Sequence, residues 1–162
     1  MKSILFLFVA AIFIMPACAQ PKSPHETADS KNISVTYGRP YKKGRDIFGG
    51  LEKYGKVWRT GADSATHITF KKDGTFGGKA VKAGTYTLFT IPNEKEWTII
   101  LNGELKQWGA FAYEQNKSKD VLQFNVPVKK LDNVVEQLTI RFPDNSMIIE
   151  WDKTQVSIPT SF

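Results

Sequence analysis

The segment HITFKKDGTF, residues 67–76, contains the strongest short hairpin signal in the chain. The run His67–Phe70 alternates polar and apolar side chains, as expected for a strand that buries one face. Asp73-Gly74 follows, and Asp-Gly is a preferred dipeptide for the two-residue turn of a β-hairpin. The segment therefore predicts a strand, a tight turn and the start of a second strand.

The same pattern recurs on both sides of this segment. Alternating or β-rich runs occupy residues 33–37, 56–60, 82–92, 96–105, 121–128, 137–142, 146–151 and 155–159. Two further glycine-containing dipeptides, Gly77-Gly78 and Asn102-Gly103, are candidate turns, and the only plausible helix is a short segment near residues 46–54. The sequence predicts an all-β fold: an antiparallel β-sandwich or jelly-roll-like barrel of about 9–10 short strands.

The first 19 residues have the pattern of a signal peptide. The basic residue Lys2 and the apolar run Ile4–Met15 precede small residues that fit cleavage after Ala19. The apolar run is short for a membrane-spanning helix, so no transmembrane segment is predicted. Alternatively, Cys18 is the lipidated first residue of a lipoprotein. We therefore expect export, to the periplasm or outer membrane or into the medium.

The polar, proline-containing residues 20–31 predict a flexible tether before a single β-sandwich domain at residues 32–162. The chain has one cysteine, so the domain cannot rely on an internal disulfide. Its sequence leaves the oligomeric state open.

Composition excludes several classes of function. The net charge is +6, but the lysines are scattered and no nucleic-acid-binding signature is present, so no nucleic-acid partner is expected. Two histidines and a single cysteine do not make a metal site, and no phosphate loop or nucleophile elbow occurs. We predict no metal, no cofactor and no catalytic residue, which makes an enzyme the less favoured class.

The stretch from Arg39 to His67 is the candidate ligand site. It holds three of the four arginines of the chain, and the planar guanidinium suits carboxylate, sulfate or phosphate. Aromatic side chains in the same stretch present flat faces to a sugar or small ligand. The predicted site consists of Arg39, Tyr41, Arg45, Trp58, Arg59, Thr60, Asp63, Thr66 and His67. The competing interpretation is structural, with Trp58 in the core and the arginines in internal ion pairs.

Several of these residues also carry a resemblance to a known family. Residues 39–66, 83–92 and 96–102, followed by Trp108-Gly109, resemble the exported bacterial proteins grouped as domain of unknown function 2911. The resemblance covers most of residues 23–159 and implies the fold and the export, but no activity. The chain departs from the family at Asp63–Thr66, where Asn-Glu-Ala-Thr is usual, and at Glu52–Gly55, where Val-Pro-Tyr-Gly is usual.

Three functions are compatible with this reading. A binding module for a small anionic ligand or glycan predicts a basic patch at one end of the fold. An envelope hydrolase or lyase predicts a carboxylate with a perturbed pKa beside an arginine. A structural or interaction protein predicts internally paired arginines and an exposed apolar patch or strand edge.

Overall fold

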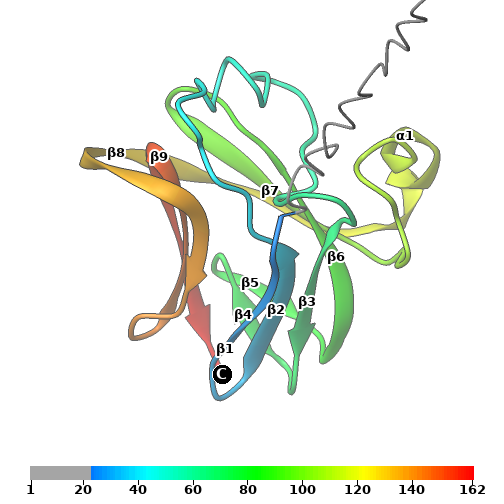
Figure 1. Cartoon of the computed structure of the whole chain (residues 1–162). Helices are drawn as coiled ribbons and strands as arrows, with labels where there is room; N and C mark the ends of the chain where they lie inside the picture. Colours follow the sequence, from blue (N-terminus) through cyan, green and yellow to red (C-terminus); the bar gives the residue numbers. More distant parts are fainter. Residues whose placement is uncertain (1–22) are drawn as a thin grey trace, which may run out of the picture.

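A computed structural model describes residues 23–162, which form one antiparallel sheet of nine strands and one short helix (Figure 1). The predicted all-β class is confirmed. The predicted signal peptide, with Ala19 and Cys18, lies outside the described residues. The elements are β1 (His25–Asp29), β2 (Ile33–Gly38), β3 (Thr66–Phe70), β4 (Gly74–Phe76), β5 (Lys79–Val81), β6 (Gly84–Ile91), β7 (Glu96–Asn102), α1 (Tyr113–Asn116), a 3-10 turn (Lys117–Lys119), β8 (Asp120–Arg141) and β9 (Ser146–Ser161).

Strand β8 joins the two layers of the fold. The sheet order is β1-β2-β3-β6-β7-β8-β9-β4-β5, and β8 pairs with β7 through its first part and with β9 through its second part. The β8–β9 pairing is irregular between Lys130 and Val135, where β8 turns the outer corner seen in Figure 1. At 22 and 16 residues, β8 and β9 are much longer than the short strands predicted.

Four aromatic rings connect these layers across the core. Phe48 and Trp58 come from the long connection between β2 and β3, Trp97 from β7, and Trp151 from β9. The Phe48 and Trp97 rings meet edge to face at 4.8 Å, and the Trp58 and Trp151 rings stack at 6.1 Å. Large aromatic surfaces of this kind dominate the energy of a core. The connection is therefore fixed to both layers by its own side chains.

Two of the three turn predictions are wrong. Strand β3 pairs with β2 and β6, and β4 with β5 and β9, so residues 71–73 carry the chain between layers and form no hairpin. The Asp73 carboxylate accepts the Ala83 backbone N–H at 2.8 Å, which ties this link to the start of β6. After Asn102, 17 residues of loop and helix precede β8 at Asp120. Only the Gly77-Gly78 hairpin is confirmed, with positive φ at both glycines and β4 paired to β5 across them.

The predicted tether and helix also need correction. Residues 25–29 of the expected tether form β1, since their backbone pairs with β2 from His25–Gly38 to Asp29–Ser34 and Ala28 packs on the core. An edge strand needs little apolar surface, so its polar composition was misleading. Residues 46–54 form turns and no helix, because backbone bonds such as Glu52 N–H to Ile47 carbonyl, at 2.8 Å, fold the segment around Phe48. The only α-helix in the described part of the chain is α1.

Arg39 closes the open side between the layers. Its guanidinium donates to the Leu138 carbonyl and the Thr139 hydroxyl, both at 3.0 Å, and pairs with the Glu26 carboxylate at 2.7 Å. The Leu138 N–H donates to the Pro40 carbonyl at 3.0 Å, so the backbone after β2 also bonds to β8. One side chain thus joins β1, the end of β2 and the second part of β8.

Replacing Arg39 with Gln should lower the free energy of unfolding by about 1.5–3 kcal/mol, because a mostly buried charged donor loses its three partners. The matched control is Arg141→Gln, which removes the pair with Glu150 at the surface of β8 and β9 and should cost about 0–1 kcal/mol. Urea denaturation of both variants measures the difference. Equal losses would show that Arg39 is not a closing contact.

Candidate functional site

Three of the predicted site residues belong to the core. Trp58 is buried in the aromatic cluster, and its indole N–H donates to the Gly61 carbonyl at 3.1 Å. The Thr60 hydroxyl bonds to the Thr90 hydroxyl at 3.1 Å, and the Thr66 hydroxyl donates to the Thr60 carbonyl at 3.0 Å. Thr60 and Thr66 are fully buried. These side chains hold the turn between residues 58 and 66, and they are not accessible to a ligand.

Two of the predicted arginines bond within the protein. Arg39 closes the layers, as described above. Arg45 donates through Nε to the Lys42 carbonyl at 2.9 Å and through Nη2 to the Tyr41 carbonyl, which folds the loop after β2 onto itself. Tyr41 makes a bridge to Gln137 of β8, and its ring is 42% exposed. For Arg39 and Arg45, the structural interpretation fits the observed contacts.

Arg59 differs from the other three arginines. Among residues 23–162 it makes no hydrogen bond or ion pair through its side chain, although its Nε atom is buried. The charge of Arg59 acts on the carboxyl of Glu52, which is half-buried. Burial raises the pKa of Glu52 above its ordinary value, and the charges of Arg59 and Arg45 oppose that rise only in part. Arg59 therefore presents donors that no group in the described part of the chain satisfies.

Asp63 connects the N-terminal strand to a distant loop. It adopts positive φ, its carboxylate lies 3.3 Å from His25 Nε2, and its carbonyl accepts the Gly109 N–H at 3.2 Å. The neighbouring Ser64 forms a bridge with Trp108. The start of β1, the turn after Arg59 and residues 108–109 are thus held together at one edge of the sheet.

The loop and helix at residues 103–119, here called the aromatic loop, are fixed by a buried polar hub. The Asn102 amide donates to the Asp120 carboxylate at 2.7 Å and to the Asn116 carbonyl at 2.9 Å. The Tyr113 hydroxyl donates to the same carboxylate at 2.7 Å, and its ring meets Phe89 edge to face at 5.1 Å. Burial, followed by the bond to Asp120, raises the pKa of Tyr113 well above its ordinary value, so the hydroxyl stays protonated.

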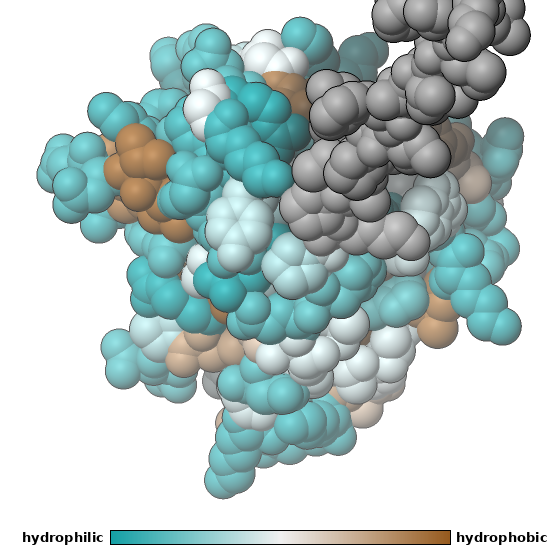
Figure 2. All heavy atoms as spheres, viewed as in Figure 1, coloured by the Kyte–Doolittle hydropathy of each residue, from teal (hydrophilic) through white to brown (hydrophobic). Residues whose placement is uncertain are grey.

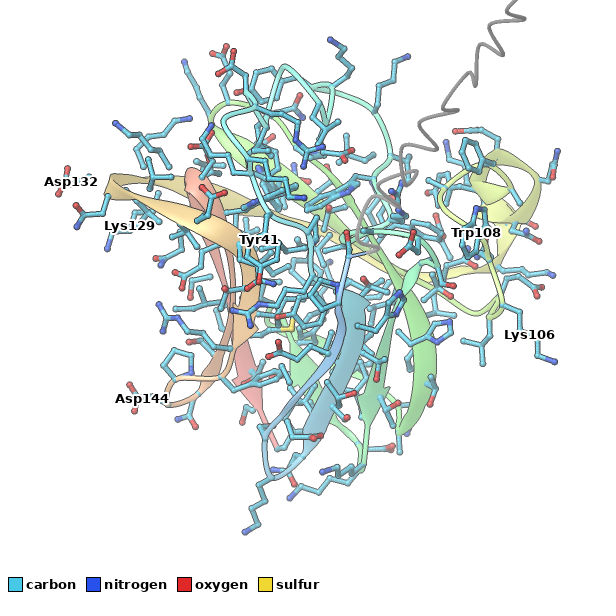
Figure 3. All side chains as sticks on the ribbon, in the orientation of Figure 1. Tyr41, Lys106, Trp108, Lys129, Asp132 and Asp144 are labelled. Carbon is cyan, nitrogen blue, oxygen red and sulfur yellow. The ribbon has the colours of Figure 1, made fainter. Side chains whose placement is uncertain are left out.

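This fixed loop exposes two aromatic side chains that the sequence reading did not identify. Trp108 is 65% exposed and Phe111 is 83% exposed. Figure 3 shows Trp108 and Lys106 beside α1, on a different part of the molecule from Tyr41. Tryptophan is usually buried, so the exposure of Trp108 is unexpected. The run Trp108–Phe111 lacks strand alternation and follows Asn102-Gly103, and that was the available signal of an exposed loop.

Most of the face shown in Figure 2 is hydrophilic. A compact hydrophobic area lies over the outer corner of β8, where Val134 is 47% exposed. That corner is the opposite end of β8 from the aromatic loop (Figure 1). The fold therefore carries at least two separate exposed apolar areas.

His67 lies on the face of β3 opposite the buried Ile68 and Phe70. It pairs across β3 with Thr36 of β2 and Thr87 of β6, which places the three side chains in one row. Its Nε2 atom is buried without a hydrogen-bond partner in the described chain. Desolvation by burial lowers the pKa of His67 below its ordinary value of 6.5. The ring is thus a neutral, partly desolvated group at neutral pH.

The described residues contain no group of three or more acidic, histidine or cysteine side chains that could hold a metal ion. None of their helices is long and apolar enough to cross a membrane. What the arrangement offers chemically is an unpaired guanidinium beside a half-buried carboxyl, together with a separate pair of exposed aromatic rings.

The chain belongs to the family described as Protein of unknown function (DUF2911), whose sequence profile matches residues 20–160. The resemblance inferred from the sequence is therefore confirmed. No curated protein and no solved structure matches the chain significantly. The family description names no activity, so the function has to be argued from the arrangement of these residues.

Replacing His67 with Gln should make folding less sensitive to acid. In the unfolded chain His67 titrates near its ordinary pKa of about 6.5, whereas the folded pKa is lower. As pH falls, the unfolded state therefore binds the proton first. The free energy of unfolding keeps its full value above about pH 7 and decreases as pH falls toward the folded pKa. Urea unfolding between about pH 7.5 and pH 5 should show a smaller loss for His67→Gln than for the wild type. Parallel curves would contradict this.

Proposed function

We propose that this member of the DUF2911 family is an exported binding protein that holds a small anionic ligand, or the acid group of a glycan, at Arg59. The observation that carries the proposal is the state of this guanidinium: Nε is buried, yet no acceptor is within bonding distance among residues 23–162. The other three arginines all have acceptors. Arg59 is thus the arginine that an external anion would complete.

Energetics support this assignment. Leaving a buried charged donor unpaired costs on the order of 1–3 kcal/mol or more, because the group has lost water and gained nothing in exchange. A carboxylate, sulfate or phosphate accepts two parallel bonds from a guanidinium and recovers that cost. Glu52 balances the charge only weakly, since burial favours its protonated form. The site therefore favours an anion over a neutral ligand.

Export from the cytoplasm is part of the same proposal. Residues 1–19 have the pattern of a signal peptide, cleaved after Ala19 or processed to a lipid-bearing Cys18. Exported proteins meet carboxylated and sulfated saccharides, which offer the anionic group that Arg59 lacks. An acidic sugar is for this reason the first ligand class to examine.

Titration with glucuronate should shift the indole N–H signal of Trp58 saturably in a 15N-labelled protein, because Trp58 directly precedes Arg59. Arg59→Gln should weaken binding by about 10- to 100-fold, the equivalent of losing a charge-assisted hydrogen bond. Glucose, which has the same ring without the carboxylate, is the ligand control. The same variant should leave the unfolding midpoint unchanged or raised, because it removes an unpaired buried donor.

The matched protein control is Arg141→Gln, since Arg141 is already paired with Glu150. This variant should bind as the wild type does. The proposal fails if glucuronate and inorganic sulfate leave the Trp58 signal unchanged, or if Arg59→Gln and Arg141→Gln lose affinity equally.

One observation favours a second function, an envelope hydrolase. Burial raises the pKa of Glu52, and a carboxyl with a raised pKa can act as a general acid on a leaving oxygen. If so, incubation with a polyuronate should generate new reducing ends, and Glu52→Gln should abolish them while Arg141→Gln does not. A polymer of unchanged length would leave binding as the function.

A further inference from the structure

The aromatic loop has the properties of a surface that meets a lipid bilayer. Trp108 and Phe111 expose 65% and 83% of their surface, three positions apart. Exposed large rings on a loop usually mark an interaction site, because exposing them to water is unfavourable. The loop is also ordered in advance, with Tyr113 buried and the Asn102 amide bonded to both Asp120 and Asn116. Binding through it would require little further ordering.

The charges around the rings select the partner. Residues 103–119 contain three lysines and two glutamates. Glu104 is already paired with Lys119, while Lys106, Lys117 and Glu114 are exposed and make no ion pair in the described chain, which leaves a net charge of +1 (three lysines minus two glutamates). Lys106 extends away from the fold on the side of the molecule that carries Trp108, and lies below Trp108 in Figure 3. Tryptophan and phenylalanine beside free lysines are typical of segments that bind anionic membrane surfaces.

The polar groups near the rings argue against a sugar at this position. The Gln107 amide is buried and donates inward to the Asn102 side chain at 3.2 Å and the Glu104 carbonyl at 2.9 Å. Phe111 has no hydrogen-bonding group, and the Glu104 carboxylate is occupied by Lys119. A sugar-binding platform needs free donors and acceptors beside the ring to fix the ligand.

The start of β1 lies close to the aromatic loop, which orients the loop relative to the N-terminal segment. His25 at the start of β1 bonds to Asp63, and the Asp63 carbonyl accepts the Gly109 N–H, next to Trp108. The chain therefore enters the described fold at the edge that carries the aromatic loop. The preceding sequence includes the apolar run Ile4–Met15 and Cys18. Any membrane attachment made by that segment would bring this edge, and hence the loop, toward the bilayer.

We propose that Trp108, Phe111 and Lys106 form a docking surface for an anionic lipid bilayer. The rings enter the interfacial region, and the lysine lies among the anionic headgroups. This surface is separate from the Arg59 site and does not depend on it.

The fluorescence of the protein provides a direct test, because Trp58, Trp97 and Trp151 are buried and Trp108 is the exposed tryptophan of the chain. The test uses residues 20–162, the form produced by cleavage after Ala19, which contains the complete described core from Ile33 to Ile158. Vesicles containing phosphatidylglycerol should shift the emission to shorter wavelength and protect it from acrylamide. Vesicles of phosphatidylcholine alone should bind much more weakly. Trp108→Phe should remove the spectral change.

Variants separate the contributions of the two ring types and of charge. Phe111→Ser should weaken vesicle binding, measured by co-sedimentation, about tenfold or more. Lys106→Glu should weaken it about tenfold at low salt and less at high salt. Val134→Ser removes an apolar side chain, 47% exposed, at the other corner of the fold and should bind as the wild type. Arg59→Gln should also bind vesicles normally, which separates this surface from the proposed ligand site.

Three results would overturn the proposal: no spectral change with phosphatidylglycerol vesicles, an equal loss in Val134→Ser and Phe111→Ser, or a change produced by glucuronate oligomers but not by vesicles. The last would assign the rings to the glycan.

Discussion

The packing of four aromatic rings between the layers determines the rest of this structure. Phe48 and Trp58 belong to a connection with no regular strand or helix, yet they lie in van der Waals reach of Trp97 and Trp151. Trp58 lies in this core, and the Nε atom of its neighbour Arg59 is also buried, without a hydrogen-bond partner among residues 23–162. The positions of Glu52 and of the Thr60–Thr66 turn follow from the same anchoring. An irregular segment thus acquires a fixed geometry without secondary structure of its own.

The four arginines illustrate how one residue type serves opposite purposes. Arg45 bonds to two backbone carbonyls of its own loop, and Arg39 bonds to a carbonyl, a hydroxyl and a carboxylate. Arg141 bonds to an acid across two strands. These three guanidinium groups make hydrogen bonds within the fold. Arg59 Nε has no hydrogen-bond partner among the described residues, and the charge of Arg59 acts only on the half-buried carboxyl of Glu52. The distinction depends on distances between segments up to 99 residues apart, such as Arg39 and Leu138, and no local pattern in the sequence contains it.

Periodicity predicted most of the strands, because each strand must bury one face regardless of its partner. The exception is residues 56–60, which form no strand and make only the isolated bridge between Trp58 and Thr90. The Gly77-Gly78 turn was also predictable, since both residues need positive φ. The hairpins predicted at Asp73-Gly74 and Asn102-Gly103 do not form, because tertiary contacts decide which strands pair. Asp73 bonds to Ala83, and the Asn102 side chain bonds to Asp120 beneath the aromatic loop. Residues 46–54 were predicted to form a short helix, but they form turns, and Phe48 packs against the core. The exposure of Trp108 could not be read from composition, because tryptophan is usually buried.

The continuity of β8 has a consequence for how this protein unfolds. A single strand of 22 residues contributes to both layers, so neither layer can open fully without removing pairing from the other. Separate melting of two halves is therefore disfavoured, and the slowest amide hydrogen exchange should be shared between β7 and β9 although they lie in different layers. Contacts between residues so far apart in sequence also imply a high contact order and correspondingly slow folding.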